Sequence, residues 1–199
     1  MRITESQLRT IIRRSLLTEA AKRPQDVPPD VMIVCRQSAG IGGSVTFRPI
    51  VKRARMSVIG MVTWDEGKPG KPNAVTTASA DPGWGPLLYD MAMEMSGDRG
   101  LMPDRVSVSE EARAVWDYYM WKRPDVEHVQ YDNRWNELTP TPNDNVEQLS
   151  AEEDPTAKPW YRSSLSKAYR RKDGRTPTLD ALEAMGKIVW ETYKDEEED

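Results

Sequence analysis

The chain has 199 residues, of which 38% are apolar and 30% are charged, a composition that suits one soluble domain with its own core. No run approaches the roughly 18 apolar residues of a membrane-spanning helix, so no membrane segment is expected. Cys35 is the single cysteine and His128 the single histidine. This excludes a disulfide framework and argues against a metal site or a Ser-His-Asp or Cys-His centre.

Charge is distributed unevenly along the chain. The net charge is -4, but residues 1–23 hold six Lys or Arg and two Asp or Glu, so this segment carries +4 and the remainder -8. A uniform basic face for nucleic acid is therefore not expected. The acidic residues 195–199 predict a solvated tail.

Residues 1–30 predict a helix followed by a linker. A capping-box pattern at residues 4–7 precedes apolar residues at helical spacing, namely Leu8, Ile11, Ile12 and Leu16. Three prolines then interrupt any helix: Pro24, Pro28 and Pro29. We expect an amphipathic helix over residues 1–19 and a linker over residues 20–30.

A β-rich stretch follows the linker. Four segments favour strands: residues 31–35, 44–50, 56–64 and 74–80. The fourth segment leads directly into a turn that contains Gly83 and Gly85. These segments predict a mostly antiparallel sheet.

The next part of the chain predicts two helices around a short strand. The first helix has an apolar stripe of Leu87, Leu88, Met91, Ala92 and Met95. The second begins at Ser109, a predicted N-cap, and has a stripe of Ala112, Val115, Trp116 and Tyr119. We expect the short strand within residues 100–105 and a further strand at residues 126–131.

Residues 136–199 predict a loop and a helical extension with an acidic tail. Four prolines make residues 136–160 loop-like, and residues 178–194 predict a final helix with Leu179, Leu182, Met185, Ile188 and Val189 facing inward. Residues 160–172 mix aromatic and basic side chains, which favours a surface helix over a segment that contacts nucleic-acid phosphates. The predicted fold class is α/β (α+β), with a mixed sheet flanked by helices.

Two motifs together resemble the GNAT superfamily of N-acyltransferases. Gly83-Trp84-Gly85 matches the two glycines of the turn that follows the family's fourth strand and binds the pyrophosphate of acetyl-CoA. The pattern of Ser109, Ala112, Val115 and Trp116 matches a later family motif loosely. The resemblance implies a GNAT-like core over residues 31–135, with cofactor-binding residues Asp81, Gly83, Trp84, Gly85 and Leu87.

The chain departs from the family pattern at three positions. Ala80 replaces the family's Arg or Gln, so this position offers no side-chain donor. Pro86 has no N–H for the phosphates, although proline is also common in the first turn of a helix. Trp116 stands where the family has the Tyr that protonates the departing thiolate, and an indole cannot do this.

The resemblance implies direct attack of an amine on the acetyl thioester. Glu66 or Asp65 is the candidate base that accepts the amine proton through water. Tyr118, Tyr119 or Tyr89 is the candidate acid. In structural terms these residues also suit a solvated hairpin turn and ordinary helix positions, and both interpretations stay open here.

A second resemblance concerns residues 17–20, Leu-Thr-Glu-Ala. They are similar to the site that prohead proteases of tailed phages cut, between Glu19 and Ala20. Residues 1–19 accordingly resemble a capsid-targeting sequence that binds capsid or scaffold proteins and is then removed. The alternative is an ordinary helix that docks on the domain or on a partner.

Three functional hypotheses follow. The first is an acyl-CoA-dependent N-acetyltransferase-like protein of a tailed phage, with acetyl-CoA as cofactor and an unknown amine or protein as acceptor. The second is a non-catalytic virion or assembly protein on a degenerate GNAT-like fold. The third is a nucleic-acid-associated protein of the capsid interior. All three place the chain in the virion interior or the host cytoplasm.

Overall fold

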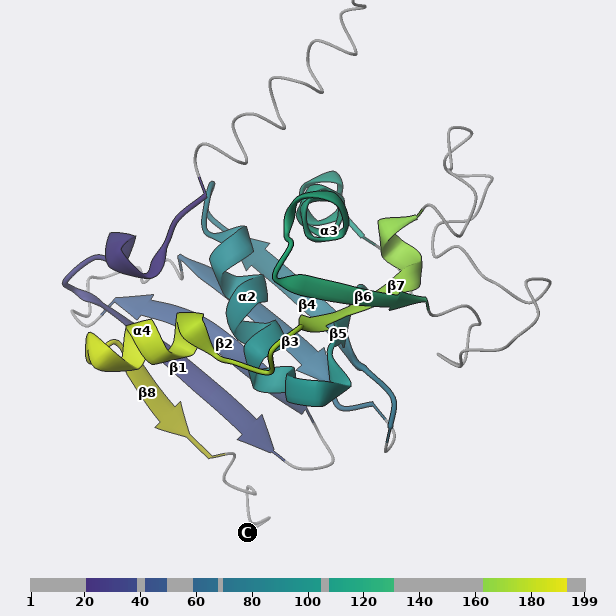
Figure 1. The fold of residues 1–199 in the computed structure, drawn as a ribbon. Helices are drawn as coiled ribbons and strands as arrows, with labels where there is room; N and C mark the ends of the chain where they lie inside the picture. Colours follow the sequence, from purple (N-terminus) through teal and green to yellow (C-terminus); the bar gives the residue numbers. More distant parts are fainter. Residues whose placement is uncertain are drawn as a thin grey trace, which may run out of the picture.

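The computed structural model describes residues 21–38, 42–49, 59–67, 70–104, 108–130 and 163–192. These residues form an α+β domain with one mixed sheet and three α-helices (Figure 1). The predicted class is therefore confirmed.

The sheet has eight strands in the order β6-β7-β5-β4-β3-β2-β1-β8. Neighbouring strands are antiparallel except for the pairs β4–β5 and β1–β8, which are parallel. The strands are β1 (Val31–Ser38), β2 (Gly42–Pro49), β3 (Gly60–Asp65), β4 (Asn73–Ala80), β5 (Leu101–Met102), β6 (Val126–Gln130), β7 (Lys167–Arg171) and β8 (Ile188–Glu191).

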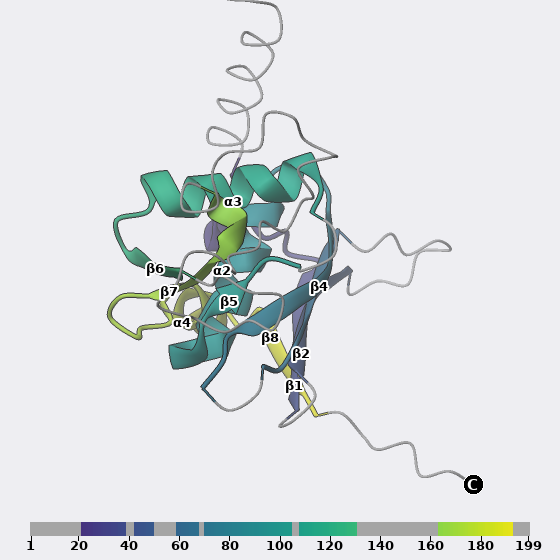
Figure 2. The same cartoon turned by 90° about the vertical axis from the view of Figure 1, so that its right-hand side faces the viewer.

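The three helices cover one face of this sheet. They are α2 (Gly85–Ser96), α3 (Glu110–Lys122) and α4 (Pro177–Ala184). Figures 1 and 2 show α2 across the middle of the sheet, α3 near the β6–β7 end and α4 near the β1–β8 end. Three short 3₁₀ turns complete the described chain: η1 (Pro24–Asp26), η2 (Gly97–Arg99) and η5 (Ser164–Ser166).

The predicted elements of the first half are confirmed where the structure describes them. β1, β2 and β4 cover the predicted segments closely, and β3 begins at Gly60, while residues 56–58 of the predicted third strand lie outside the described residues. Every apolar residue predicted for the stripe of α2 is buried. Burying a Leu or Met side chain contributes about 1.5–3 kcal/mol, so this helix anchors the core.

The start of α3 also agrees with its predicted cap. The Ser109 hydroxyl oxygen accepts the Ala112 N–H at 3.2 Å, and Glu110 and Glu111 lie in the first turn. The cap satisfies one free helix donor and the two carboxylates complement the helix dipole. Val115, Trp116 and Tyr119 are buried as predicted.

The predicted final helix is wrong beyond Ala184. α4 ends there, and Ile188–Glu191 forms β8 beside β1. Gly186 has a φ of +64°, its N–H donates to Glu183 O, and the Lys187 N–H donates to Leu182 O. This pair of bonds is the Schellman helix end that a glycine favours.

The surface helix predicted within residues 160–172 is also wrong. Lys167–Arg171 forms β7, which lies between β5 and β6. Its Tyr169 ring is fully buried and stacks on Trp116 at 5.2 Å. The sheet therefore incorporates residues from the segment predicted as a helical extension.

Part of the predicted linker packs on the domain. Val27 is only 5% exposed and belongs to the hydrophobic core. The Lys22 N–H donates to Gly83 O at 2.9 Å, so this segment contacts the glycine turn that joins β4 to α2. Residues 1–20, which include the predicted helix and the Glu19–Ala20 bond, lie outside the described residues.

Candidate functional site

Strand β4 has an open edge over its second half. It pairs with β3 along its length but with β5 only through Asn73–Leu101 and Ala74–Met102. Among the described residues no strand pairs with the β5-facing edge of residues 75–80, and residues 76–80 are exposed. An unpaired strand edge presents backbone N–H and C=O groups to a ligand.

A β-bulge interrupts β4 at Thr76. Thr63 pairs with Thr77 and Trp64 pairs with Val75, so Thr76 is the extra residue on β4. Its hydroxyl lies 2.9 Å from the hydroxyl of Thr63. Because a bulged residue is left out of the ladder, and bulges concentrate next to active sites, Thr76 is a functional candidate. Sequence reasoning missed it, and the strand pattern contains no signal for it.

The glycine turn joins β4 to α2. Gly83 has a φ of +87°, a conformation that favours glycine, and the Trp84 N–H donates to Asp81 O at 3.1 Å. Helix α2 begins at Gly85 without a side-chain cap. An uncapped helix N-terminus with converging N–H groups is a favourable place for an anion.

The predicted cofactor residues differ in how they can contribute. Asp81 is exposed, Gly85 is half-buried and Gly83 is buried. The Trp84 indole packs on Phe47 at 5.3 Å, and the Leu87 side chain is 3% exposed. Leu87 therefore offers a ligand only its backbone N–H, while the Trp84 N–H and C=O are already bonded to Asp81 and Leu88.

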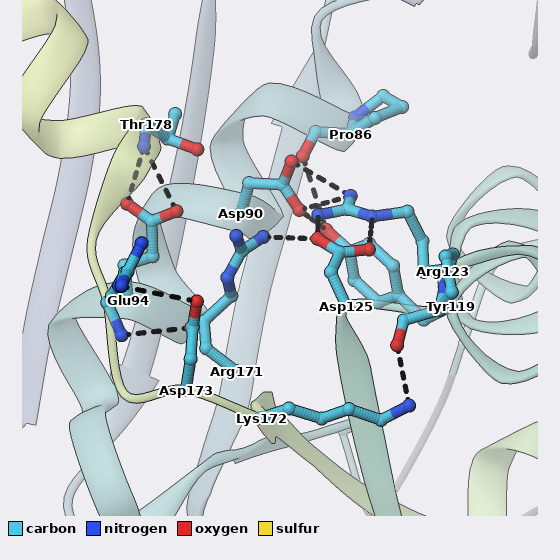
Figure 3. A network of polar contacts seen from close by, with 12 residues as sticks. Pro86, Asp90, Glu94, Tyr119, Arg123, Asp125, Arg171, Lys172, Asp173 and Thr178 are labelled. Atoms are coloured by element: carbon cyan, nitrogen blue, oxygen red, sulfur yellow. Dashed lines mark hydrogen bonds and ion pairs between the residues drawn. The ribbon is translucent and has the colours of Figure 1, made fainter.

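Tyr119 lies in a buried polar network (Figure 3). Its hydroxyl donates to Asp90 Oδ1 at 2.8 Å, and the Pro86 carbonyl oxygen lies 3.2 Å from it. Burial and the nearby Asp90 carboxylate raise the pKa of Tyr119 well above its ordinary value. The phenol is thus a fixed hydrogen-bond donor inside the protein. Tyr118, its neighbour on α3, is only half-buried.

Two arginines and two aspartates complete the network. Arg123 donates to both oxygens of Asp90, at 2.9 and 3.0 Å, and to both oxygens of Asp125, at 2.8 Å each. Arg171 Nη1 donates to Asp125 at 2.6 Å. Burial raises the pKa of Asp90, and Arg123 opposes that effect.

Sequence reasoning also missed the acidic residues of α2. Asp90 and Glu94 stand four residues apart on a helix whose other residues in that stretch are buried and mostly apolar. Carboxylates at that spacing within an apolar helix indicate buried partners, because an unpaired charge in the core is costly. The sequence signal was therefore available.

Glu66 lies at the other end of β4 from the glycine turn. It follows β3, and its Oε1 is 2.7 Å from Arg99 Nη1. It lines a hollow of about 480 Å³ with Trp64, Asn73, Ser96 and others. Eight strand residues span about 25 Å, so the structure does not bring Glu66 and the turn together.

The position that the resemblance gives to the acid tyrosine is part of the core. Trp116 is 1% exposed, and its ring lies 5.0 Å from Tyr89 and 5.9 Å from Tyr119. Tyr89 is buried too, which raises its pKa. Neither Tyr89 nor Tyr119 faces solvent.

The cations of β7 are paired. Arg170 bonds Glu127, Arg171 bonds Asp125, and the Lys167 ammonium donates to Gln130. The charges of Arg170 and Arg171 are neutralised by these carboxylates, so β7 forms a weak stripe for phosphates. Within the described residues, no three metal-ligating side chains cluster, and no helix is long and apolar enough to cross a bilayer.

The described chain is therefore an α+β protein whose mixed sheet contains a half-open central strand that ends in a glycine turn. Comparisons with models of protein families, with curated proteins and with solved structures each gave no match.

Proposed function

We propose that this chain is a GNAT-like protein that binds an acyl-CoA along β4 and transfers its acyl group to an amine. The observation that carries the proposal is the course of β4, which leaves β5 after Ala74, bulges at Thr76 and runs into the glycine turn of α2. The order β4, turn, α2, β5, α3 supports it, since this is the order on which the resemblance rests.

The backbone of the turn would hold the cofactor pyrophosphate. Gly83, Gly85 and the Leu87 N–H are the groups assigned to it, with Asp81 and Trp84 framing the turn. The open edge of residues 75–80 would lie along the extended arm of the cofactor. Ala80 adds no donor here, so the proposed recognition is mainly through backbone groups.

The chemistry would depend on positioning. A bound acyl-CoA supplies an activated acyl group. The bulge leaves Thr76 outside the regular β3–β4 ladder, and its backbone N–H is the group that we assign to the developing oxyanion. Holding the acceptor amine against the carbonyl carbon supplies much of the remaining rate enhancement.

The three predicted catalytic residues receive different support. Tyr118, half-buried on α3, is kept as the group that would protonate the CoA thiolate, which leaves when the carbon–sulfur bond of the thioester breaks as the amide bond forms. Tyr119 is not, because its hydroxyl donates inside the Asp90 network. Glu66 is ion-paired with Arg99 at the far end of β4, so we do not assign it the base.

A second candidate is a non-catalytic virion or assembly protein that kept this fold. The burial of Trp116 at the acid position favours it, since that site cannot supply a proton. Residues 1–19 would then bind capsid or scaffold proteins, in the virion interior or in the host cytoplasm before assembly.

Calorimetry with acetyl-CoA tests the proposal. Gly85 has room for a side chain, with only Val115 Cγ2 at 3.9 Å from an added Cβ, so Gly85→Glu places a carboxylate at the turn without a backbone clash. Ala184→Glu adds the same charge at the exposed end of α4 and is the matched control.

We expect micromolar binding by the unaltered chain, a loss of about tenfold or more in Gly85→Glu and no change in Ala184→Glu. Equal affinity of Gly85→Glu and Ala184→Glu for acetyl-CoA would show that the cofactor does not bind at the turn. No binding at millimolar acetyl-CoA, by the full chain or by a chain beginning at Ala20, would overturn the acyl-CoA proposal and leave the assembly role.

A further inference from the structure

A side chain of α3 forms hydrogen bonds with the first turn of α2. Helix α2 starts at Gly85, and the carbonyl oxygen of Pro86 lies 3.2 Å from the Tyr119 hydroxyl. The same hydroxyl is 2.8 Å from Asp90 Oδ1, one turn further along α2. A phenol carries one proton, so two acceptors on α2 share one donor from α3.

The contact at Pro86 adds to the helical geometry of α2 in restraining the direction of a neighbouring donor. The Pro86 C=O and the Leu87 N–H belong to one planar peptide group, and they point in opposite directions. A hydrogen bond that fixes this carbonyl therefore fixes the Leu87 N–H, which points toward the N-terminal side of the helix and the glycine turn.

The rest of the network keeps Tyr119 in place. Asp90 accepts two bonds from Arg123, and Arg123 is in turn held by Asp125. Arg171 of β7 also bonds Asp125. The Tyr119 ring is fully buried beside the stacked rings of Trp116 and Tyr169, at centroid distances of 5.9 and 6.0 Å. The hydroxyl thus has little freedom to move away from α2.

We infer that Tyr119 is a positioning residue for the glycine turn: through Pro86 and Asp90 it orients the first-turn N–H groups of α2 toward the cofactor phosphates. The inference rests on the proposed function. It assigns Tyr119 no contact with the cofactor and no proton transfer. It also gives a role to a buried polar network that the proposed chemistry does not use.

The test compares Tyr119→Phe with Tyr169→Phe. Both tyrosines are fully buried in the same aromatic cluster, and the Tyr169 hydroxyl donates to Ser164 O at 2.7 Å, away from α2. Each variant loses one buried hydroxyl and keeps its ring, so a merely structural effect falls on both. Two ligands are used: acetyl-CoA and S-acetylpantetheine, which lacks the pyrophosphate.

We expect Tyr119→Phe to bind acetyl-CoA about tenfold more weakly while its affinity for S-acetylpantetheine is unchanged, and Tyr169→Phe to bind both like the unaltered chain. Equal acetyl-CoA affinity in the two variants would overturn the inference. An equal loss for both ligands in Tyr119→Phe would also overturn it, because the effect would not be located at the phosphates.

Amide hydrogen exchange gives a readout that needs no cofactor. Leu88, whose N–H donates to Trp84 O at 3.1 Å, reports on the first turn of α2. We expect faster exchange at Leu88 in Tyr119→Phe than in Tyr169→Phe. Unchanged exchange overturns the positioning role, whereas failure of the unaltered chain to bind acetyl-CoA overturns the proposed function.

Discussion

The Glu94 carboxylate of α2 caps α4 by accepting the backbone N–H of Thr178, at 3.0 and 3.1 Å to its two oxygens. It also accepts the Leu179 N–H at 2.9 Å. The N-cap residue of α4, Thr176, makes no such bond itself, so a residue 84 positions away supplies the cap (Figure 3). Helix α4 therefore depends on α2 for its start.

Glu94→Gln is expected to destabilise the protein by about 2 kcal/mol, because an amide satisfies fewer buried helix donors and lacks the charge that the helix terminus favours. Urea denaturation measures this. Glu183→Gln is the matched control, since Glu183 is exposed and its carboxylate accepts one hydrogen bond from the Trp190 Nε1–H, at 2.8 Å. Equal losses in the two variants would show that Glu94 is not a cap of consequence.

Asp125 predicts an acid-dependent loss of stability. Its bonds to Arg123 lower its pKa from the ordinary 3.8 to about 2. A depressed pKa stabilises the folded state above the unfolded pKa, and this contribution disappears as the pH falls from about 4 to about 2. The difference in stability between the unaltered chain and Asp125→Asn should therefore shrink over that window. Urea titrations at several pH values test it, and a constant difference contradicts it.

At Gly100, we expect any side chain to lower the free energy of unfolding. Its φ is +72°, and an added Cβ would lie 2.7 Å from Tyr169 O. Gly100→Ala should cost about 3 kcal/mol, from backbone strain plus the clash between β5 and β7. Gly174→Ala should cost about 1 kcal/mol, because its φ is +63° but nothing lies within 4 Å. Urea unfolding of the two variants measures the difference. Equal midpoints for Gly100→Ala and Gly174→Ala would contradict the clash.

Cys35 should be chemically silent in the folded protein. Burial, with a smaller effect of Glu183, raises its pKa to about 12, so the reactive thiolate is scarce at pH 8. Labelling with a disulfide reagent is expected to be slow in buffer and rapid in denaturing urea. The chain has one cysteine, so the signal is unambiguous. Rapid labelling in buffer would place Cys35 at an accessible surface.

Local patterns predicted α2, α3 and the first strands because their apolar spacing and the cap at Ser109 act within a few residues. β7 was mistaken for a helix because its pairing partners, β5 and β6, lie far away in the sequence. The charges of Arg170 and Arg171 are matched by Glu127 and Asp125 only in the folded chain.

In the candidate site too, some features could be predicted from the local sequence and others could not. Gly83 and Gly85 were readable as a turn before a helix, since glycine has a local conformational meaning. The Thr76 bulge and the pairing of Asp90 with Arg123 depend on register and on packing between helices. The helix predicted across Gly186 was an avoidable error, because a glycine after an apolar stripe is a common helix end.

The strand order has a consequence for biosynthesis. Among the described strands, β6 joins the sheet only through β7 and the outer edge of β1 is covered only by β8, so both borders of the sheet are completed by residues 167–191. β8 is made after all the other described strands, and β7 after all of them except β8. The nascent chain must therefore carry two unfinished sheet borders until residues 167–191 have been translated, and a chain shortened before β7 would lose order at both borders at once.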